Sequence, residues 1–181
     1  MKVMREVAMK VDSIEIGDHI KVKLPGETHF ATAIRKDDDG VLFYFDDCLK
    51  NTQPMNKEGG TEGGYLESDL RKALKEIEKM LPKKILKDIV PNEDGDYLYL
   101  LSMTEVCGCD ENFDDCEGQI PWFKEDWKRR IATRENSYEW YWLRDVVSAA
   151  SFASVYGTGS CFYNYASDAY GVRPAFKIRN L

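Results

Sequence analysis

The C-terminal part of the chain, residues 138–178, carries the pattern that most restricts how the chain can fold. Its aromatic and β-branched residues come in short runs, and turn-forming residues separate these runs. Trp140 and Trp142 are two positions apart, and this period places both indoles on one face of an extended strand. The next two runs are divided by Gly157 and Gly159, which suit a turn that requires positive φ. The pattern predicts a compact aromatic β-meander.

The last run, residues 172–176, is predicted to form an edge or terminal strand. Pro174 has no N–H group, so it cannot donate to a hydrogen-bond ladder in the middle of a sheet. Within residues 138–178, no nucleophile, base and orienting group are spaced as a catalytic triad requires. Six side chains of this region are expected to be largely buried: Trp142, Leu143, Val155, Phe162, Val172 and Phe176.

The first quarter of the chain predicts a β-hairpin. Residues 20–24 alternate between apolar and polar side chains, as expected of a half-buried strand. Residues 30–35 and 41–45 flank the sequence Lys-Asp-Asp-Asp-Gly at 36–40, which is the strongest hairpin signal in the chain. Residues 1–11 show no clear period, and we assign them to an arm or an early strand.

Residues 68–89 predict a pair of helices. Ser68 precedes a run in which apolar residues recur at helical spacing, and Pro82 can occupy the first position of a second, shorter helix. The predicted apolar face of the pair consists of Leu70, Ala73, Leu74, Ile77, Leu81, Ile85, Leu86 and Ile89. The lysines on the opposite side are expected to form a solvated face.

Three further local predictions follow from short patterns. The glycine-rich residues 50–66 are expected to form a flexible surface loop, because no Lys-Ser or Lys-Thr follows the glycines as in a phosphate-binding loop. Residues 96–101 are predicted to form a strand. Ser102 and Glu105 have the spacing of a capping box, which predicts a single helical turn after them.

Length and charge limit the class of protein. A chain of 181 residues can build one well-buried domain, whereas two would be cramped. The net charge of −7 disfavours direct binding of nucleic acid and favours a partner with a basic surface. No apolar run approaches the roughly 20 residues needed to cross a bilayer. Because residues 1–10 also lack an apolar signal core, we expect a cytoplasmic protein that binds no membrane.

An acidic loop at residues 107–120 contains three of the five cysteines. Their odd number and irregular spacing predict no disulfide framework. A zinc site would need a fourth ligand at a plausible position, and the acidic residues lack the spacing of a calcium loop. We therefore expect thiols without a bound metal or cofactor, with a structural metal as the alternative. The acidic side chains are the predicted contact site for a partner: Asp110, Glu111, Asp114, Asp115 and Glu117.

The two histidines give no catalytic signal. His19 and His29 are the only histidines, and the sequence implies no Cys, Ser or carboxylate partner for either. We expect them to be solvent-facing residues of strands or loops, and we assign no catalytic residue.

Several motifs resemble those of a bacterial and phage family of unknown function. The most specific are Trp-Leu-Arg at 142–144 and Gly-Val-Arg-Pro-Ala-Phe at 171–176, and residues 65–71, 81–82 and 100–106 fit the same family. More distantly, the chain resembles the C-type-lectin-like fold that formylglycine-generating enzymes share with variable phage receptor-binding proteins. The resemblance implies a single α+β domain over residues 1–181, with the helical pair packed on a C-type-lectin-like β assembly. Members commonly continue Trp-Leu-Arg with Ser-Pro, whereas this chain has Asp145 and Val146, so we carry over no role for that loop.

The overall resemblance, the size and the acidity also make the chain similar to type II anti-CRISPR proteins. This resemblance implies a non-enzymatic protein, encoded by a mobile element, that inhibits a host nucleic-acid enzyme by stoichiometric binding. The expected partner is a type II CRISPR-Cas nuclease with its guide RNA. Such nucleases hold nucleic acid in basic channels, where an acidic loop can dock.

Two other functions compete with this hypothesis. One is a lectin-like ligand- or receptor-binding module of a phage or bacterial surface protein, with sugar-stacking aromatics such as Trp140, Trp142, Tyr163 and Tyr165, although tryptophans that alternate on one face are usually core. The other is an enzyme of the formylglycine-generating type, whose chemistry uses a reactive cysteine pair. Cys161 has no locally paired second cysteine, so we do not expect an enzyme.

Overall fold

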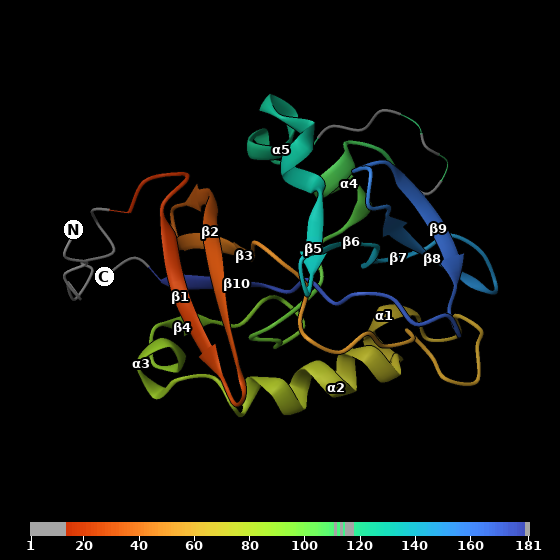
Figure 1. Cartoon of the computed structure of the whole chain (residues 1–181), viewed down its shortest axis with the longest axis horizontal. Helices are drawn as coiled ribbons and strands as arrows, with labels where there is room; N and C mark the ends of the chain where they lie inside the picture. The colour runs from red at the N-terminus through yellow and green to blue at the C-terminus, as the bar shows by residue number, and fades with distance from the viewer. Residues whose placement is uncertain (1–13, 111, 113, 115–117, 180–181) are drawn as a thin grey trace.

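The computed structural model describes residues 14–110, 112, 114 and 118–179, which form an α+β fold built mostly of antiparallel sheets (Figure 1). The predicted α+β class is therefore confirmed. The strands are β1 His19–Leu24, β2 Glu27–Asp37, β3 Gly40–Phe45, β4 Ile89–Val90, β5 Ala132–Arg134, β6 Ser137–Glu139, β7 Tyr141–Val146, β8 Ser151–Val155, β9 Cys161–Tyr165 and β10 Ala175–Arg179. The helices are α1 Gly64–Glu67, α2 Asp69–Glu78, α3 Lys83–Leu86, α4 Met103–Cys107, α5 Pro121–Glu125 and the 3-10 helix η2 Trp127–Arg130.

The larger sheet has the strand order β1-β2-β3-β10-β4. Its β1–β2–β3 part contains the predicted hairpin, so the alternation in β1 and the turn between β2 and β3 are confirmed. The prediction for residues 172–176 is wrong in position, because β10 begins at Ala175 and lies inside the sheet between β3 and β4. Pro174 directly precedes β10, and its carbonyl accepts a hydrogen bond from the N–H of Phe45 at 3.1 Å. A proline at this position interrupts no ladder, which allows the strand after it to be central.

The predicted aromatic meander is the three-stranded sheet β7-β8-β9. Five of the six side chains expected to be buried are buried: Trp142, Leu143, Val155, Val172 and Phe176. The sixth prediction is wrong, because Phe162 is 41% exposed. Phe162 belongs to β9, which ends the strand order of this sheet, and an edge strand is covered less completely than a central one.

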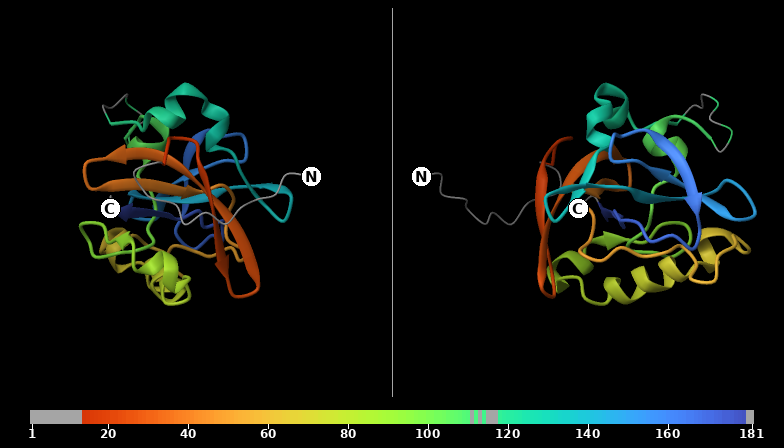
Figure 2. Two further views of the ribbon diagram at one scale, coloured as in Figure 1. Left: turned by 90° about the vertical axis from the view of Figure 1, so that its left-hand side faces the viewer. Right: turned by 45° about the vertical axis from the view of Figure 1, so that its right-hand side comes forward.

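Two hydrophobic cores lie on opposite faces of the central strands. Strand β3 directs Phe43 into the first core and Tyr44 into the second, while β7 directs Trp142 into the first and Tyr141 into the second. Side chains of a strand alternate between faces, so both faces of these strands are covered. Helix α2 packs on the first core, and α4 and α5 pack on the second from the opposite side of the molecule (Figure 2).

Both helices of the pair predicted at residues 68–89 are present, as α2 and α3, and only the end of the segment differs. Ser68 caps α2, its side-chain oxygen accepting a hydrogen bond from the N–H of Arg71 at 3.1 Å. Pro82 stands immediately before the short helix α3. Ile89 was expected on the helical face, but it begins β4 and pairs with Ile178 of β10. The available pairing with β10 therefore overrides the weak helical signal at this end of the segment.

The strand predicted at residues 96–101 is wrong. Only one bridge, between Tyr99 and Ala175, forms in this segment. The N–H groups of Tyr97 and Leu98 both donate to Glu78 Oε1 at 2.9 Å, so a carboxylate from α2 takes the donors that a ladder would have used. The capping box that follows is confirmed, since the side chains of Ser102 and Glu105 bond reciprocally to each other's backbone N–H.

The glycine-rich residues 50–66 are not simply a flexible surface loop. Met55 is fully buried, and Gln53 forms a bridge with Tyr170. The carbonyl of Gln53 also accepts a hydrogen bond from Trp142 Nε1 at 2.8 Å. This segment is therefore part of the support for the meander. Among the described residues, no helix is long and apolar enough to cross a membrane.

Candidate functional site

The closing motif Gly-Val-Arg-Pro-Ala-Phe proves to be structural. A Cβ added at Gly171 would lie 2.6 Å from the sulfur of Cys48 and 2.9 Å from the carbonyl oxygen of Trp140, so only glycine fits there. Phe176 and Ala175 contribute to the two cores. The residues that carry the most specific resemblance therefore build the junction between the two larger sheets rather than a ligand site.

Arg173, in the same motif, is a buried cation. Its Nε donates to the carbonyl of Phe45 at 2.7 Å, and its Nη1 donates to the carbonyl of Arg130 at 3.1 Å. The guanidinium carbon lies 4.2 Å from the centre of the Tyr44 ring, and Nη1 also donates to the hydroxyl of Tyr141 at 3.3 Å. Carbonyl oxygens and ring faces thus compensate its charge, which fixes the segment before β10 against β3 and η2.

The acidic loop is described only in part. Asp110 is half-buried and Asp114 is exposed, whereas Glu111, Asp115, Cys116 and Glu117 lie outside the described residues. The Asp110 carboxylate accepts hydrogen bonds from the N–H groups of Asn112 at 2.8 Å and Asp114 at 3.3 Å. This carboxylate therefore shapes its own loop. Among the described residues, no three potential metal ligands of the His, Cys, Asp or Glu type form a group.

A disulfide joins Cys107 at the end of α4 to Cys161 at the start of β9. The prediction that Cys107 is a thiol is therefore wrong, and Cys161, for which no local cysteine partner was found, has a partner that is distant in the sequence. Their Cα atoms are 6.3 Å apart, which is within the range of a disulfide, although the two residues are 54 positions apart in the sequence. Only folding of the chain brings them together. Cys48 is not in a disulfide, and burial raises the pKa of its thiol to about 12, so it stays protonated at neutral pH.

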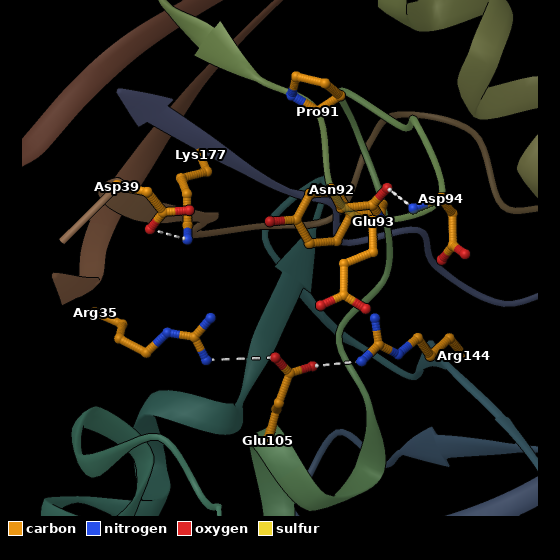
Figure 3. A pocket seen from close by; sticks show the side chains of 10 residues that line it. Arg35, Asp39, Pro91, Asn92, Glu93, Asp94, Glu105, Arg144 and Lys177 are labelled. Atoms are coloured by element: carbon orange, nitrogen blue, oxygen red, sulfur yellow. Dashed lines mark hydrogen bonds and ion pairs between the residues drawn. The ribbon is translucent and has the colours of Figure 1, made fainter. Parts of the chain in front are cut away.

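A polar pocket of about 250 Å³ is lined in part by charged residues from β2, α4, β7 and β10 (Figure 3). Glu105 lies between two guanidiniums, 3.5 Å from Arg35 and 3.4 Å from Arg144. Lys177 contacts Asp39 at 2.7 Å. The lining carries three cations and four carboxylates, and each cation lies beside a carboxylate, so the charges nearly cancel and give little net attraction for a charged substrate.

Both histidines have carboxylate partners that the sequence did not reveal. His29 Nε2 lies 2.7 Å from Glu27, beside a pocket of about 300 Å³ that is also lined by Cys48. His19 Nδ1 lies 3.2 Å from Asp46, and Thr32 contacts both. The Cys48 thiol is protonated and buried, so the His29 pocket contains no activated cysteine nucleophile.

The most distinctive surface feature is a row of five aromatic side chains, which we call the aromatic strip. Its members in order of contact are Tyr170, Trp140, Tyr156, Phe162 and Tyr163. Successive ring centroids are 5.5, 4.0, 5.1 and 4.6 Å apart. The exposed fractions of Trp140, Phe162 and Tyr163 are 37%, 41% and 40%, so the strip is a surface and not an extension of the core.

The strip is held in place by the meander. Tyr170 stacks on Trp140 and also contacts the buried Trp142 edge-on at 5.2 Å, which confirms that both indoles point to one face. The Tyr170 hydroxyl donates to Asn164 at 3.2 Å, and the Asn164 amide donates to Ser154 at 2.8 Å. These contacts limit the rotamers of the rings, so little conformational entropy remains to be lost when a ligand binds.

Sequence reasoning identified the aromatic residues but not the strip. Trp142 was a candidate for ligand stacking and is buried, whereas Tyr163 and Tyr165 are exposed. One signal could have indicated the surface: residues 146–167 contain no charged side chain, although 31% of the chain is charged. An uncharged aromatic segment in so charged a protein is typical of an interface.

Comparison with known families gives one match. A family model described as a domain of unknown function (DUF6273) matches residues 39–180. No curated protein and no solved structure matches the chain. The matched span includes the whole meander, the aromatic strip, the disulfide and Arg173, whereas β1 and β2 precede it.

Proposed function

The chain belongs to the family of the domain of unknown function DUF6273, and we propose that it is a non-enzymatic module that binds a partner protein through its aromatic strip. The observation that carries this proposal is the row of five contacting, partly exposed rings on the meander. Aromatic residues are enriched where proteins bind proteins, because a few large, rigid side chains supply most of the binding energy.

The composition around the strip supports the same function. Residues 156–165 consist of tyrosine, phenylalanine, glycine, serine, threonine, asparagine and one cysteine. Tyrosine with serine, glycine and asparagine is the composition of antibody paratopes, in which rigid aromatic rings give contact area and small polar residues give adaptable hydrogen bonds. We also propose that the β assembly is C-type-lectin-like, as the sequence resemblance implies.

A protein ligand fits the strip better than a sugar. A sugar ring stacks on the open face of an aromatic ring. Trp140 already stacks on two other rings, Tyr156 at 4.0 Å and Tyr170 at 5.5 Å, which reduces the ring face that a sugar could cover. The exposed parts of the rings form an apolar row that an apolar protein surface can cover.

We expect a photoreactive benzoyl derivative of phenylalanine at Tyr156 to form a covalent adduct with one protein in a bacterial lysate. The matched control has the same residue at Met80, which is 46% exposed and follows α2. Adding Phe162→Ser to the Tyr156 derivative should reduce the yield of the adduct by about tenfold or more, because Phe162 would be one of the rings that anchor the interface. Adducts of equal yield from both positions, or no effect of Phe162→Ser, would exclude the strip as the recognition surface.

A second proposal is that the acidic loop docks on a basic host protein, specifically a type II CRISPR-Cas nuclease with its guide RNA, and inhibits it. The net charge of −7 and the exposed Asp114 support it. Changing Asp110, Glu111, Asp114 and Asp115 to lysine should then weaken binding without unfolding the protein, because Asp114 is exposed and the hydrogen bonds of Asp110 stay within its own loop. Binding should also weaken as salt rises. The affinity would be measured by titrating the protein against the nuclease with and without guide RNA. An affinity that changes neither with salt nor with the four substitutions would contradict docking through the acidic loop.

A further inference from the structure

The lysines of α2 and α3 differ in how their charges are compensated. Each of the three lysines in α2 and at its end lies beside a carboxylate: Lys72 beside Asp69, Lys75 beside Asp96 and Lys79 beside Glu76. The three lysines in α3 and at its end are Lys83, Lys84 and Lys87, which we call the lysine patch. All three are exposed, and none forms an ion pair with another described residue. Positive charge is therefore neutralised along α2 and left uncompensated at α3.

The three side chains of the lysine patch project from one side of α3. Lys87 is four positions after Lys83 and three after Lys84, and residues at these spacings are neighbours on a helix surface. Ile85 and Leu86 pack against the first core, which leaves the lysine side facing solvent. Like charges at these spacings repel each other and destabilise a helix. A bound anion would remove this repulsion, so the patch is suited to an anionic partner.

Exposed apolar side chains accompany the patch at this end of α2. Met80, between α2 and α3, is 46% exposed, although Leu81 after it is buried. Tyr97 is 37% exposed, and its N–H donates to Glu78, the last residue of α2. A methionine side chain is flexible and adapts to the shape of an apolar partner. The surface therefore offers apolar contact together with three cations.

The charge of the whole protein limits the size of the anion. Helix α3 has four residues and is thus only about 6 Å long. At physiological ionic strength, an exposed charge is felt over about 8 Å. A short acidic segment of a protein can stay within that distance of the lysines. A bilayer or a long nucleic acid would extend over the rest of the surface, and a chain with a net charge of −7 would repel it there.

We propose that the lysine patch and Met80 bind a short acidic segment of a partner protein, in which carboxylates flank an apolar side chain. The carboxylates contact the ammonium groups, and the apolar side chain covers Met80. An ammonium on a flexible stem accepts carboxylates without a fixed geometry, so three lysines suit a segment of this kind.

This surface is separate from the aromatic strip. Helix α1, which precedes α2, packs on β7 of the meander, whereas α3 lies at the opposite end of α2 (Figure 1). The inference therefore goes beyond the proposed function, because it assigns a second interaction surface that can be tested without the first.

We expect a fluorescein-labelled peptide of sequence Glu-Glu-Leu-Glu-Glu-Leu-Glu-Glu to bind the wild-type protein in a fluorescence anisotropy titration. Lys83→Gln, Lys84→Gln and Lys87→Gln together should raise the Kd by about tenfold or more, because they remove all three cations. This patch variant should unfold at no lower temperature than the wild type, because the repulsion within α3 is also removed.

The matched control changes three exposed lysines elsewhere to glutamine: Lys72, Lys124 and Lys128. It alters the net charge by the same amount, but the changes lie on α2, α5 and η2, so the Kd should rise by less than about threefold. Met80→Ser should weaken binding of the leucine-containing peptide and leave the Kd of an all-glutamate peptide of the same length unchanged.

Three results would overturn the proposal. The first is no change of anisotropy with the wild-type protein, and the second is an equal rise of the Kd in the patch variant and the control. The third is that the patch binds a short oligothymidylate or phosphatidylglycerol vesicles more tightly than the peptide, which would assign it to nucleic acid or to a bilayer. None of these results bears on the photo-crosslinking at Tyr156.

Discussion

Replacing Arg173 with alanine should lower the free energy of unfolding by about 3–5 kcal/mol. The change leaves a void in place of a large buried side chain. It also removes the donor to the carbonyls of Phe45 and Arg130 and to the hydroxyl of Tyr141, and of these residues Phe45 and Tyr141 are fully buried. Denaturant unfolding monitored by tryptophan fluorescence would measure the loss.

Two variants isolate the cause of this effect. Arg173→Lys keeps the charge but loses the planar fork that reaches several carbonyls at once, so it should recover only part of the stability. Arg144 lies at the rim of the charged pocket, and its side chain is 37% exposed. Arg144→Ala should therefore lower the free energy of unfolding by about 1 kcal/mol or less. If Arg173→Ala and Arg144→Ala lower the free energy of unfolding equally, Arg173 does not have the structural role assigned to it.

Trp142→Ala should also lower the free energy of unfolding by on the order of 3–5 kcal/mol, as large-to-small changes of buried aromatic residues do. The indole is fully buried in the first core, and its Nε1 donates to Gln53 in the glycine-rich segment. The substitution therefore creates a cavity and releases the loop that supports the meander. Thermal melts of the purified variant would report the loss.

The neighbouring residue provides a matched comparison for Trp142. Trp140 has the same side chain but is 37% exposed and stacks on the strip residues Tyr156 and Tyr170, so Trp140→Ala should lower the free energy of unfolding by less than half as much. An unchanged melting temperature for Trp142→Ala, or equal losses for the two tryptophans, would contradict the assignment of Trp142 to the core.

Local patterns predicted the parts of the fold that depend on neighbours in sequence. The hairpin β2–β3, the Ser68 cap of α2, the capping box at Ser102 and the three-stranded meander are all confirmed. In each of these the signal and the structure lie within a few residues of each other, and the spacing of apolar and turn residues is enough to specify them.

Contacts between distant segments were not predictable in the same way. The Cys107–Cys161 disulfide and the central place of β10 both depend on residues that the chain brings together only after folding. Arg173 looks like a surface residue in the sequence because arginine is rarely buried, and its compensation by carbonyls from β3 and η2 has no local sequence signal. The strip likewise needs Tyr170, which is 30 positions from Trp140.

The central position of β10 has a consequence for synthesis of the chain on the ribosome. All six residues of β3 are buried in the folded protein, yet Tyr44 pairs with Ala175, which is made roughly 130 residues later. At the usual 5–20 residues per second, β3 therefore waits on the order of 10 s for this partner. During that interval its apolar side chains are incompletely covered, so nascent chains should be substrates for chaperones that recognise exposed hydrophobic strands.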